Sequence, residues 1–166
     1  ISINSLFADD FDSWVISFKE YAMKKGISKN TLDITMSKVK FLPRVIEYDR
    51  YQPEFYEDTY TYISKRTSNE KVKKGKKLFI NNNSLILDVE SKFNVEKELL
   101  LSLMGIETNF GKYLGKMDIL SSLATLSYDK RRSEFFTKEL ITILRLIDAG
   151  VVDSNILYGS WAGAFG

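Results

Sequence analysis

The chain has 166 residues, of which 44% are hydrophobic and 28% are charged, and its formal net charge is +2 at pH 7. This balance is typical of a folded globular protein, argues against a disordered tail, and does not by itself indicate a nucleic-acid binder. The sequence contains neither Cys nor His, which excludes disulfides, thiolate and imidazole metal sites, cysteine nucleophiles and the serine–histidine–aspartate triad. Any catalysis must therefore use carboxylate, Lys, Tyr, Ser or Arg side chains.

The first eight residues form an apolar stretch that ends in the small residue Ala8 and precedes two acidic residues. This pattern predicts the remnant of a secretory signal peptide in residues 1–8, and a frayed N-terminus is the alternative. No stretch of the chain approaches the ~20 apolar residues that a membrane-spanning helix needs. The missing Cys also excludes a lipobox cysteine for lipid anchoring in this sequence.

Beyond the first residues, apolar side chains recur with the period of an α-helix. Asp12, Ser28 and Asn94 are predicted N-caps, and Gly150 is a predicted C-terminal stop. Residues 44–52 are expected to be irregular, and Gly75 and the run of three asparagines at 81–83 are expected to bend a long helix. Because no segment shows the alternation typical of a strand, the predicted fold class is all-α. The expected helices, in chain order, span residues 12–26, 28–42, 54–66, 68–93, 94–107, 120–127 and 133–149.

Glu107 is the candidate catalytic residue. It lies four and eight residues after Leu103 and Leu99, so the three side chains share one stripe of a helix. Burial of a carboxylate on an apolar stripe favours its protonated form, which is what a general acid needs. The polar turn at residues 108–111 should end the helix and leave Glu107 at an open end. The alternative is an ordinary surface glutamate at a helix terminus.

Basic and aromatic residues elsewhere are candidates for ligand binding. Arg131 and Arg132 have guanidinium groups that can hold carboxylates or sugar oxygens, and the alternative is a solvated basic turn. The small residues at 159–166 allow a ligand or another backbone to approach closely, and Trp161 either stacks on a sugar ring or fills the core. The aromatic residues between Tyr48 and Tyr62 could line a sugar site, although their spacing favours the core. The lysines at 71–77 indicate a solvated helix face or contact with an anionic polymer or membrane surface.

Several motifs in a fixed order resemble one known family. They include GIETNFG at 105–111, LATLSYD at 123–129 and GSWAGAFG at 159–166, with further matches at 115–116, 131–136 and shorter segments before residue 56. Together they resemble the lytic murein transglycosylases of the membrane-bound B type, glycoside hydrolase family 103. The resemblance extends from about Phe11 to Gly166.

This resemblance implies a lysozyme-like α fold with Glu107 at the catalytic position. Members of the family cleave the β-1,4 bond between N-acetylmuramic acid and N-acetylglucosamine without hydrolysis. The acid protonates the leaving oxygen, and the resulting carboxylate assists attack by the C6 hydroxyl of the sugar, which yields a 1,6-anhydromuramic end. An internal nucleophile explains why a single carboxylate stands out, whereas hydrolases need two. The chemistry requires no metal or cofactor.

The motif match also implies substrate-binding residues. Ser160 would lie beside the muramic acid ring, and Arg131 and Arg132 would contact the glycan or its peptide-bearing lactyl group. Phe135 stands where the family carries Tyr, and Tyr62 matches a substrate-lining position more weakly. The implied partner is peptidoglycan rather than nucleic acid, with cell-wall synthesis proteins or the outer membrane as possible associates. The implied location is the periplasm, after export by a signal peptide.

In the family, the glycine-rich segment continues into a further motif and the rest of the domain, which in some members carries a calcium-binding loop. Residues 9–166 are therefore expected to be the N-terminal part of a transglycosylase catalytic domain that is truncated at its C-terminus, and this piece alone is expected to be inactive. The alternative hypothesis is a non-catalytic module that binds peptidoglycan or serves as a scaffold.

Overall fold

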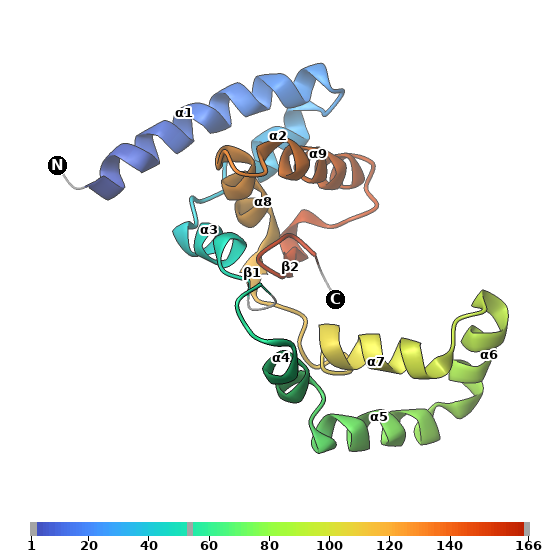
Figure 1. Ribbon diagram of the computed structural model, residues 1–166. Helices are drawn as coiled ribbons and strands as arrows, with labels where there is room; N and C mark the ends of the chain where they lie inside the picture. The colour runs from blue at the N-terminus through green and yellow to red at the C-terminus, as the bar shows by residue number, and fades with distance from the viewer. Residues whose placement is uncertain (1–2, 53–54, 165–166) are drawn as a thin grey trace. The chain divides into compact units, whose positions relative to one another are not determined.

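The computed structural model describes residues 3–52 and 55–164, and these residues are mostly helical (Figure 1). The chain divides into two compact units, one made of residues 1–51 and 115–165 and the other of residues 52–114. Within the described ranges, no helix combines the length and the hydropathy that spanning a bilayer requires.

The first unit contains five α-helices of the described chain and one small sheet. Strands β1 (Met117–Asp118) and β2 (Tyr158–Gly159) pair antiparallel, with Met117 opposite Gly159. The sequence did not predict these strands, because two residues are too few to show an alternating pattern. The helices are α1 (Ile3–Lys24), α2 (Lys29–Thr35), α3 (Pro43–Arg50), α8 (Ile119–Tyr128) and α9 (Ser133–Asp148), followed by the 3-10 helix η2 (Ser154–Ile156).

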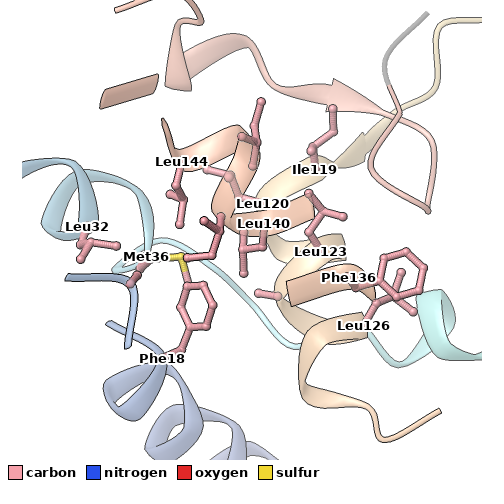
Figure 2. Packing of buried hydrophobic residues seen from close by; sticks show 14 of the residues in the cluster. Phe18, Leu32, Met36, Ile119, Leu120, Leu123, Leu126, Phe136, Leu140 and Leu144 are labelled. Atoms are coloured by element: carbon pink, nitrogen blue, oxygen red, sulfur yellow. The ribbon is translucent and has the colours of Figure 1, made fainter. Parts of the chain in front are cut away.

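Helix α8 lies at the centre of this unit, and its residues from Ile119 to Ser127 are all buried. It packs against α1, α3 and α9. Figure 2 shows side chains from α1 and α2, such as Phe18 and Leu32, converging with side chains from α8 and α9. Two of the buried hydroxyl groups of α8 accept backbone hydrogen bonds from the segment before α3: Ser121 Oγ accepts from the Lys40 N–H and Thr125 Oγ1 from the Leu42 N–H, each at 3.0 Å. Ser122 Oγ and Ser127 Oγ are buried without a hydrogen-bond partner among the described residues. A helix that is buried on all sides thus combines apolar and hydroxyl residues.

The second unit contains four helices of the described chain. Helices α5, α6 and α7 pack against one another in pairs. Few of their side chains are fully buried, and the buried positions include Gly75, Ile86 and Gly105. The bounds of the helices are α4 (Thr59–Arg66), α5 (Asn69–Asn81), α6 (Asn83–Phe93) and α7 (Lys97–Glu107).

Local capping chemistry agrees with the sequence in several places. The Ser28 side chain caps α2 by accepting a hydrogen bond from the Thr31 N–H. Gly150 ends α9 with a left-handed φ of 69°. The expected bend in the 68–93 segment is confirmed as a break at Asn82, which separates α5 from α6.

Other predicted helix boundaries were wrong. Asp12 lies inside α1, because the residues before it contain no Gly or Pro and the helix continues through them. The supposedly irregular segment at 44–52 is largely α3, since Pro43 occupies its first turn and its fixed φ favours a helix start. Asn94 has a φ of 51° and closes α6 instead of opening α7. The helix predicted to begin at 54 begins instead at Thr59, because the Asp58 side chain caps it by accepting from the Thr61 N–H; residue 54 itself lies outside the described residues.

Asp148 joins the end of α9 to the start of α2. Its Oδ2 accepts from the Ser28 N–H at 3.2 Å, and its Oδ1 accepts from the hydroxyl groups of Ser28 and Thr31, each at 2.5 Å. These hydrogen bonds hold the pKa of Asp148 below its usual value of 3.8, and the one from the Ser28 side chain has the largest effect. The carboxylate form therefore stabilises the contact between residues 120 positions apart.

We expect Asp148→Asn to lower the thermal midpoint at neutral pH, because an amide has one acceptor oxygen where the carboxylate uses two. A carboxyl group whose pKa is lower in the folded than in the unfolded protein stabilises the fold at pH values above its unfolded-state pKa. This contribution is lost as the pH falls through the folded-state pKa. The difference between variant and parent should accordingly begin to shrink below about pH 5 and continue to shrink as the pH falls further. Thermal unfolding followed by circular dichroism measures it, with Asp12→Asn on the exposed face of α1 as the control. Equal thermal midpoints for Asp148→Asn and the parent at neutral pH would contradict a stabilising role for the Asp148 carboxylate.

Candidate active site

Glu107 is the last residue of α7. The expected burial of its carboxylate is wrong for this structure, because Glu107 is exposed and Leu99 and Leu103 on the same stripe are 53% and 49% exposed. Within residues 3–52 and 55–164, the carboxylate forms no hydrogen bond or ion pair. The open helix end that the sequence predicted is present, so Glu107 is accessible to a ligand.

The turn after Glu107 has an unusual backbone. Asn109 and Phe110 have φ values of 50° and 60°, in the left-handed region that residues other than glycine rarely adopt. The Phe110 N–H donates to the Met104 carbonyl at 2.9 Å, and the Gly111 N–H donates to Thr108 Oγ1 at 2.9 Å. The turn is therefore held by hydrogen bonds at the same point where α7 ends.

The Phe110 ring lies in a slot between two glycines on facing helices. A Cβ atom added to Gly105 of α7 would lie 2.8 Å from Phe110 Cζ, and one added to Gly75 of α5 would lie 3.2 Å from it. Both glycines leave the space that the ring occupies. Because Phe110 follows Glu107 by three residues, this contact holds the helix end that carries the carboxylate.

We expect Gly105→Ala to lower the thermal midpoint. In a helix interior, replacing Gly by Ala normally stabilises by about 1 kcal/mol, but overpacking the Phe110 slot costs about 1–3 kcal/mol. An added Cβ on Gly75 lies farther from Phe110 Cζ, so Gly75→Ala should change the thermal midpoint less, in either direction. Circular dichroism melting of both variants measures the difference, and a raised midpoint for Gly105→Ala would show that the slot does not constrain the turn.

Tyr62 lies on α4, half-buried, with the Arg66 guanidinium 3.6 Å from the centroid of its ring. Arg66 also pairs with Glu57 at 3.2 Å, so one face of the Tyr62 ring is covered by a cation. The expectation that spacing places most of the neighbouring aromatic residues in the core is wrong. Phe55, Tyr56 and Tyr60 are 75%, 62% and 81% exposed. The first two precede α4, so helical spacing does not apply to them.

Arg131 and Arg132 lie in the turn between α8 and α9, and both donate to Asp49 of α3. Arg131 Nη1 lies 2.7 Å from Asp49 Oδ2, and Arg132 Nη2 pairs with Oδ1. The Asp49 side chain is 1% exposed, whereas the two arginine side chains are 45% and 39% exposed. The turn is therefore anchored and not simply solvated.

Three arginines meet two aspartates around Asp49 in the described part of the chain. Besides the pairs that Arg131 and Arg132 form with Asp49, Arg50 pairs with Asp129 at 2.7 Å. The guanidinium groups of Arg131 and Arg132 each carry five N–H donors, more than their contacts with Asp49 use. The arrangement can therefore accept an anionic group without losing its internal ion pairs.

Phe135 begins the exposed side of α9 and is 54% exposed. The Arg132 guanidinium lies 6.0 Å from the centroid of its ring, and the ring of the buried Phe136 meets it edge-on at 5.0 Å. The structure thus brings three of the predicted substrate residues together in the first unit, with Arg131 and Arg132 in the turn before α9 and Phe135 in the first turn of α9. Sequence reasoning missed Asp49 as the partner of the arginines, because it lies near the end of α3 and its partners are far away in the sequence.

Ser160 shapes the glycine-rich segment. Its Oγ accepts from the N–H groups of Ala162 at 3.3 Å and Ala164 at 3.1 Å. A Cβ on Gly159 would lie 2.3 Å from the Ala164 carbonyl oxygen, so the small residues allow backbones to approach one another. Trp161 packs against the hydrophobic core, as one of the two sequence interpretations proposed. Phe165 and Gly166 lie outside the described residues.

The chain is similar to known cell-wall enzymes. Residues 10–166 match the family model described as the transglycosylase SLT domain. Membrane-bound lytic murein transglycosylase B from Escherichia coli (strain K12) is 41% identical over 75 residues, which cover 45% of this chain and 21% of that protein.

Solved structures resemble most of the chain. SltB3 from Pseudomonas aeruginosa, in complex with NAG-NAM-pentapeptide, is 31% identical with a TM-score of 0.84, over 94% of this chain and 42% of that one. The Escherichia coli lytic transglycosylase Slt35, in complex with bulgecin A, is 29% identical with a TM-score of 0.79, over 92% and 49%. The chain thus spans less than half the length of these relatives. The likeness confirms the all-α, lysozyme-like fold class.

Proposed function

The chain belongs to the transglycosylase SLT domain family, and on this basis we propose that it acts in a peptidoglycan lytic transglycosylase. The substrate is the β-1,4 bond between N-acetylmuramic acid and N-acetylglucosamine. The proposal is supported by the family match over residues 10–166 and by the likeness to a protein crystallised with NAG-NAM-pentapeptide. A glycan site also agrees with a chain whose chemistry excludes thiol and imidazole catalysis.

The observation that carries the proposal is the position of Glu107, an exposed carboxylate at a helix end held by the Phe110 slot. In the proposed reaction Glu107 donates its proton to the leaving glycosidic oxygen. Its carboxylate then accepts the proton of the C6 hydroxyl as that oxygen attacks the anomeric carbon. The product is a 1,6-anhydromuramic end, and no water is consumed. The internal hydroxyl is held close to its target, which removes the need for a second carboxylate.

The arginine turn is the proposed binding site for the acidic part of the substrate. Arg131 and Arg132 retain free N–H donors and lie beside the exposed ring of Phe135. A planar guanidinium binds a carboxylate through two parallel hydrogen bonds, which suits the peptide-bearing lactyl group. Ser160 retains a hydroxyl proton that could donate to a sugar oxygen, and Tyr62 is the weakest of the proposed contacts.

We propose that the protein works in the periplasm, because its substrate lies outside the cytoplasmic membrane. The signal-peptide prediction for residues 1–8 agrees with export, and α1 begins within that segment at Ile3. The relative from Escherichia coli is named membrane-bound. Fractionation of cells that carry the tagged gene would test the location.

The test of the activity uses protein produced from the complete coding sequence and purified peptidoglycan. Mass spectrometry of the soluble products should find anhydromuropeptides. Release of reducing-end sugars would instead assign a lysozyme-type hydrolase. Sedimentation with peptidoglycan sacculi and no soluble product would favour the non-catalytic binding module.

A further inference from the structure

A pocket of about 500 Å³ lies in the second unit, between α5 and α7. Its wall is mainly apolar and includes Val72, Phe79, Ile80, Leu101, Ile106 and Phe110. A volume of this size is in the range of small-molecule sites, about 300–1,000 Å³. Neither Glu107 nor any other residue proposed to bind the glycan lines the pocket.

The rim of this pocket is basic. Of its four cationic residues, two have acidic partners, since Arg66 pairs with Glu57 and Lys97 with Glu90 and Glu98. The other two, Lys71 and Lys76, form no ion pair within the part of the chain that the structure describes.

We propose that this pocket binds an amphiphile with a single alkyl chain and an anionic head group. The apolar wall removes the alkyl chain from water, and the two lysines attract the head group. A sugar fits poorly, because sugar hydroxyls need several polar partners and the wall has few. A pocket of about 500 Å³ also suits one ligand better than the length of an amphipathic helix.

The pocket wall touches the part of α7 that ends in Glu107. Ile106 precedes Glu107, and Phe110 is the ring held between the two glycines. A bound alkyl chain would therefore pack against residues that hold the helix end. Binding itself does not depend on the proposed transglycosylase activity, so the two proposals can fail separately.

Titration calorimetry of the chain with sodium laurate, below its critical micelle concentration, tests the proposal. We expect one site per chain, with affinity for dodecyltrimethylammonium at least about tenfold weaker because the rim is basic. Ser102→Trp places an indole in the pocket from an exposed wall position and should abolish binding. Ser91→Trp on α6, outside the pocket, is the matched control and should bind as the parent does.

A second pair of variants tests the charge. The double variant Lys71→Glu with Lys76→Glu should weaken laurate binding by about tenfold. The double variant Lys73→Glu with Lys74→Glu makes the same change in net charge on the same helix, away from the pocket lining, and should change the affinity by about twofold at most. Circular dichroism confirms that each variant is folded.

The proposal is overturned if laurate binds Ser102→Trp as tightly as the parent, or if the cationic and anionic amphiphiles bind equally. It is also overturned if no laurate binds while an acidic amphipathic peptide does, since the site would then be a peptide groove. Binding that appears only above the micelle threshold would show detergent adsorption and no pocket.

Discussion

Glu107→Gln should abolish the release of anhydromuropeptides from peptidoglycan. The amide has almost the same size but can neither donate the proton to the leaving oxygen nor accept one from the C6 hydroxyl. Losing a general acid or base typically lowers a rate by about 10²–10⁴, and here one residue is proposed to serve in both steps. The loss should therefore lie at the upper end of this range or beyond it.

The same substitution should leave the fold unchanged, because Glu107 is exposed and has no hydrogen-bond partner among the described residues. Surface substitutions of this kind usually change stability by at most about 0.5 kcal/mol. The Glu107→Gln variant should also still sediment with sacculi. Glu96→Gln at the other end of α7 is the control and should retain activity. Substantial turnover by Glu107→Gln would move the catalytic role to another residue.

Asp49→Ala should cause the largest loss of stability among these variants. The carboxylate is 1% exposed and accepts from both Arg131 and Arg132. Removing one partner of a buried ion pair typically costs about 3–5 kcal/mol, because the remaining charge is left without compensation. Since the two arginine side chains are 45% and 39% exposed and can gain water, we expect a value of about 3 kcal/mol. Urea denaturation measures the change in the free energy of unfolding.

Asp33 offers a matched control for this test. It also accepts from two cations, Lys19 at 2.7 Å and Lys29 at 2.5 Å, but its side chain is 43% exposed. Exposed ion pairs contribute little to stability, so Asp33→Ala should have a much smaller effect. Similar losses for Asp33→Ala and Asp49→Ala would mean that burial does not set the strength of the arginine cluster. Asp49→Asn should also weaken sedimentation with sacculi if the arginines bind the substrate.

Residues close in the sequence were the most predictable part of the fold. Ser28 caps its helix as expected, and the asparagine run separates α5 from α6. These features depend on side chains that reach a backbone group within one turn. The errors at Asp12 and Pro43 arose because the same residue type serves inside, before or after a helix, and its neighbours decide which.

The candidate site was predictable where it rests on ordered motifs and unpredictable where it rests on packing. Glu107 and the arginine pair could be named from the sequence because their neighbours form recognisable segments. The exposure of Leu99 and Leu103 could not, since a helical stripe shows which residues share a face and not what covers it.

The sequence by itself determined the fold class, the family, most helix ends and the residues that can carry chemistry without Cys or His. Only the tertiary structure decided that Arg131 and Arg132 share Asp49, residues 82 and 83 positions away. It also decided that Phe110 fills the space left by Gly75 and Gly105, and that α5 and α7 enclose a basic-rimmed pocket. The physical reason is that capping and periodicity act within a few residues, whereas burial and ion pairing depend on which distant segments the packing brings together.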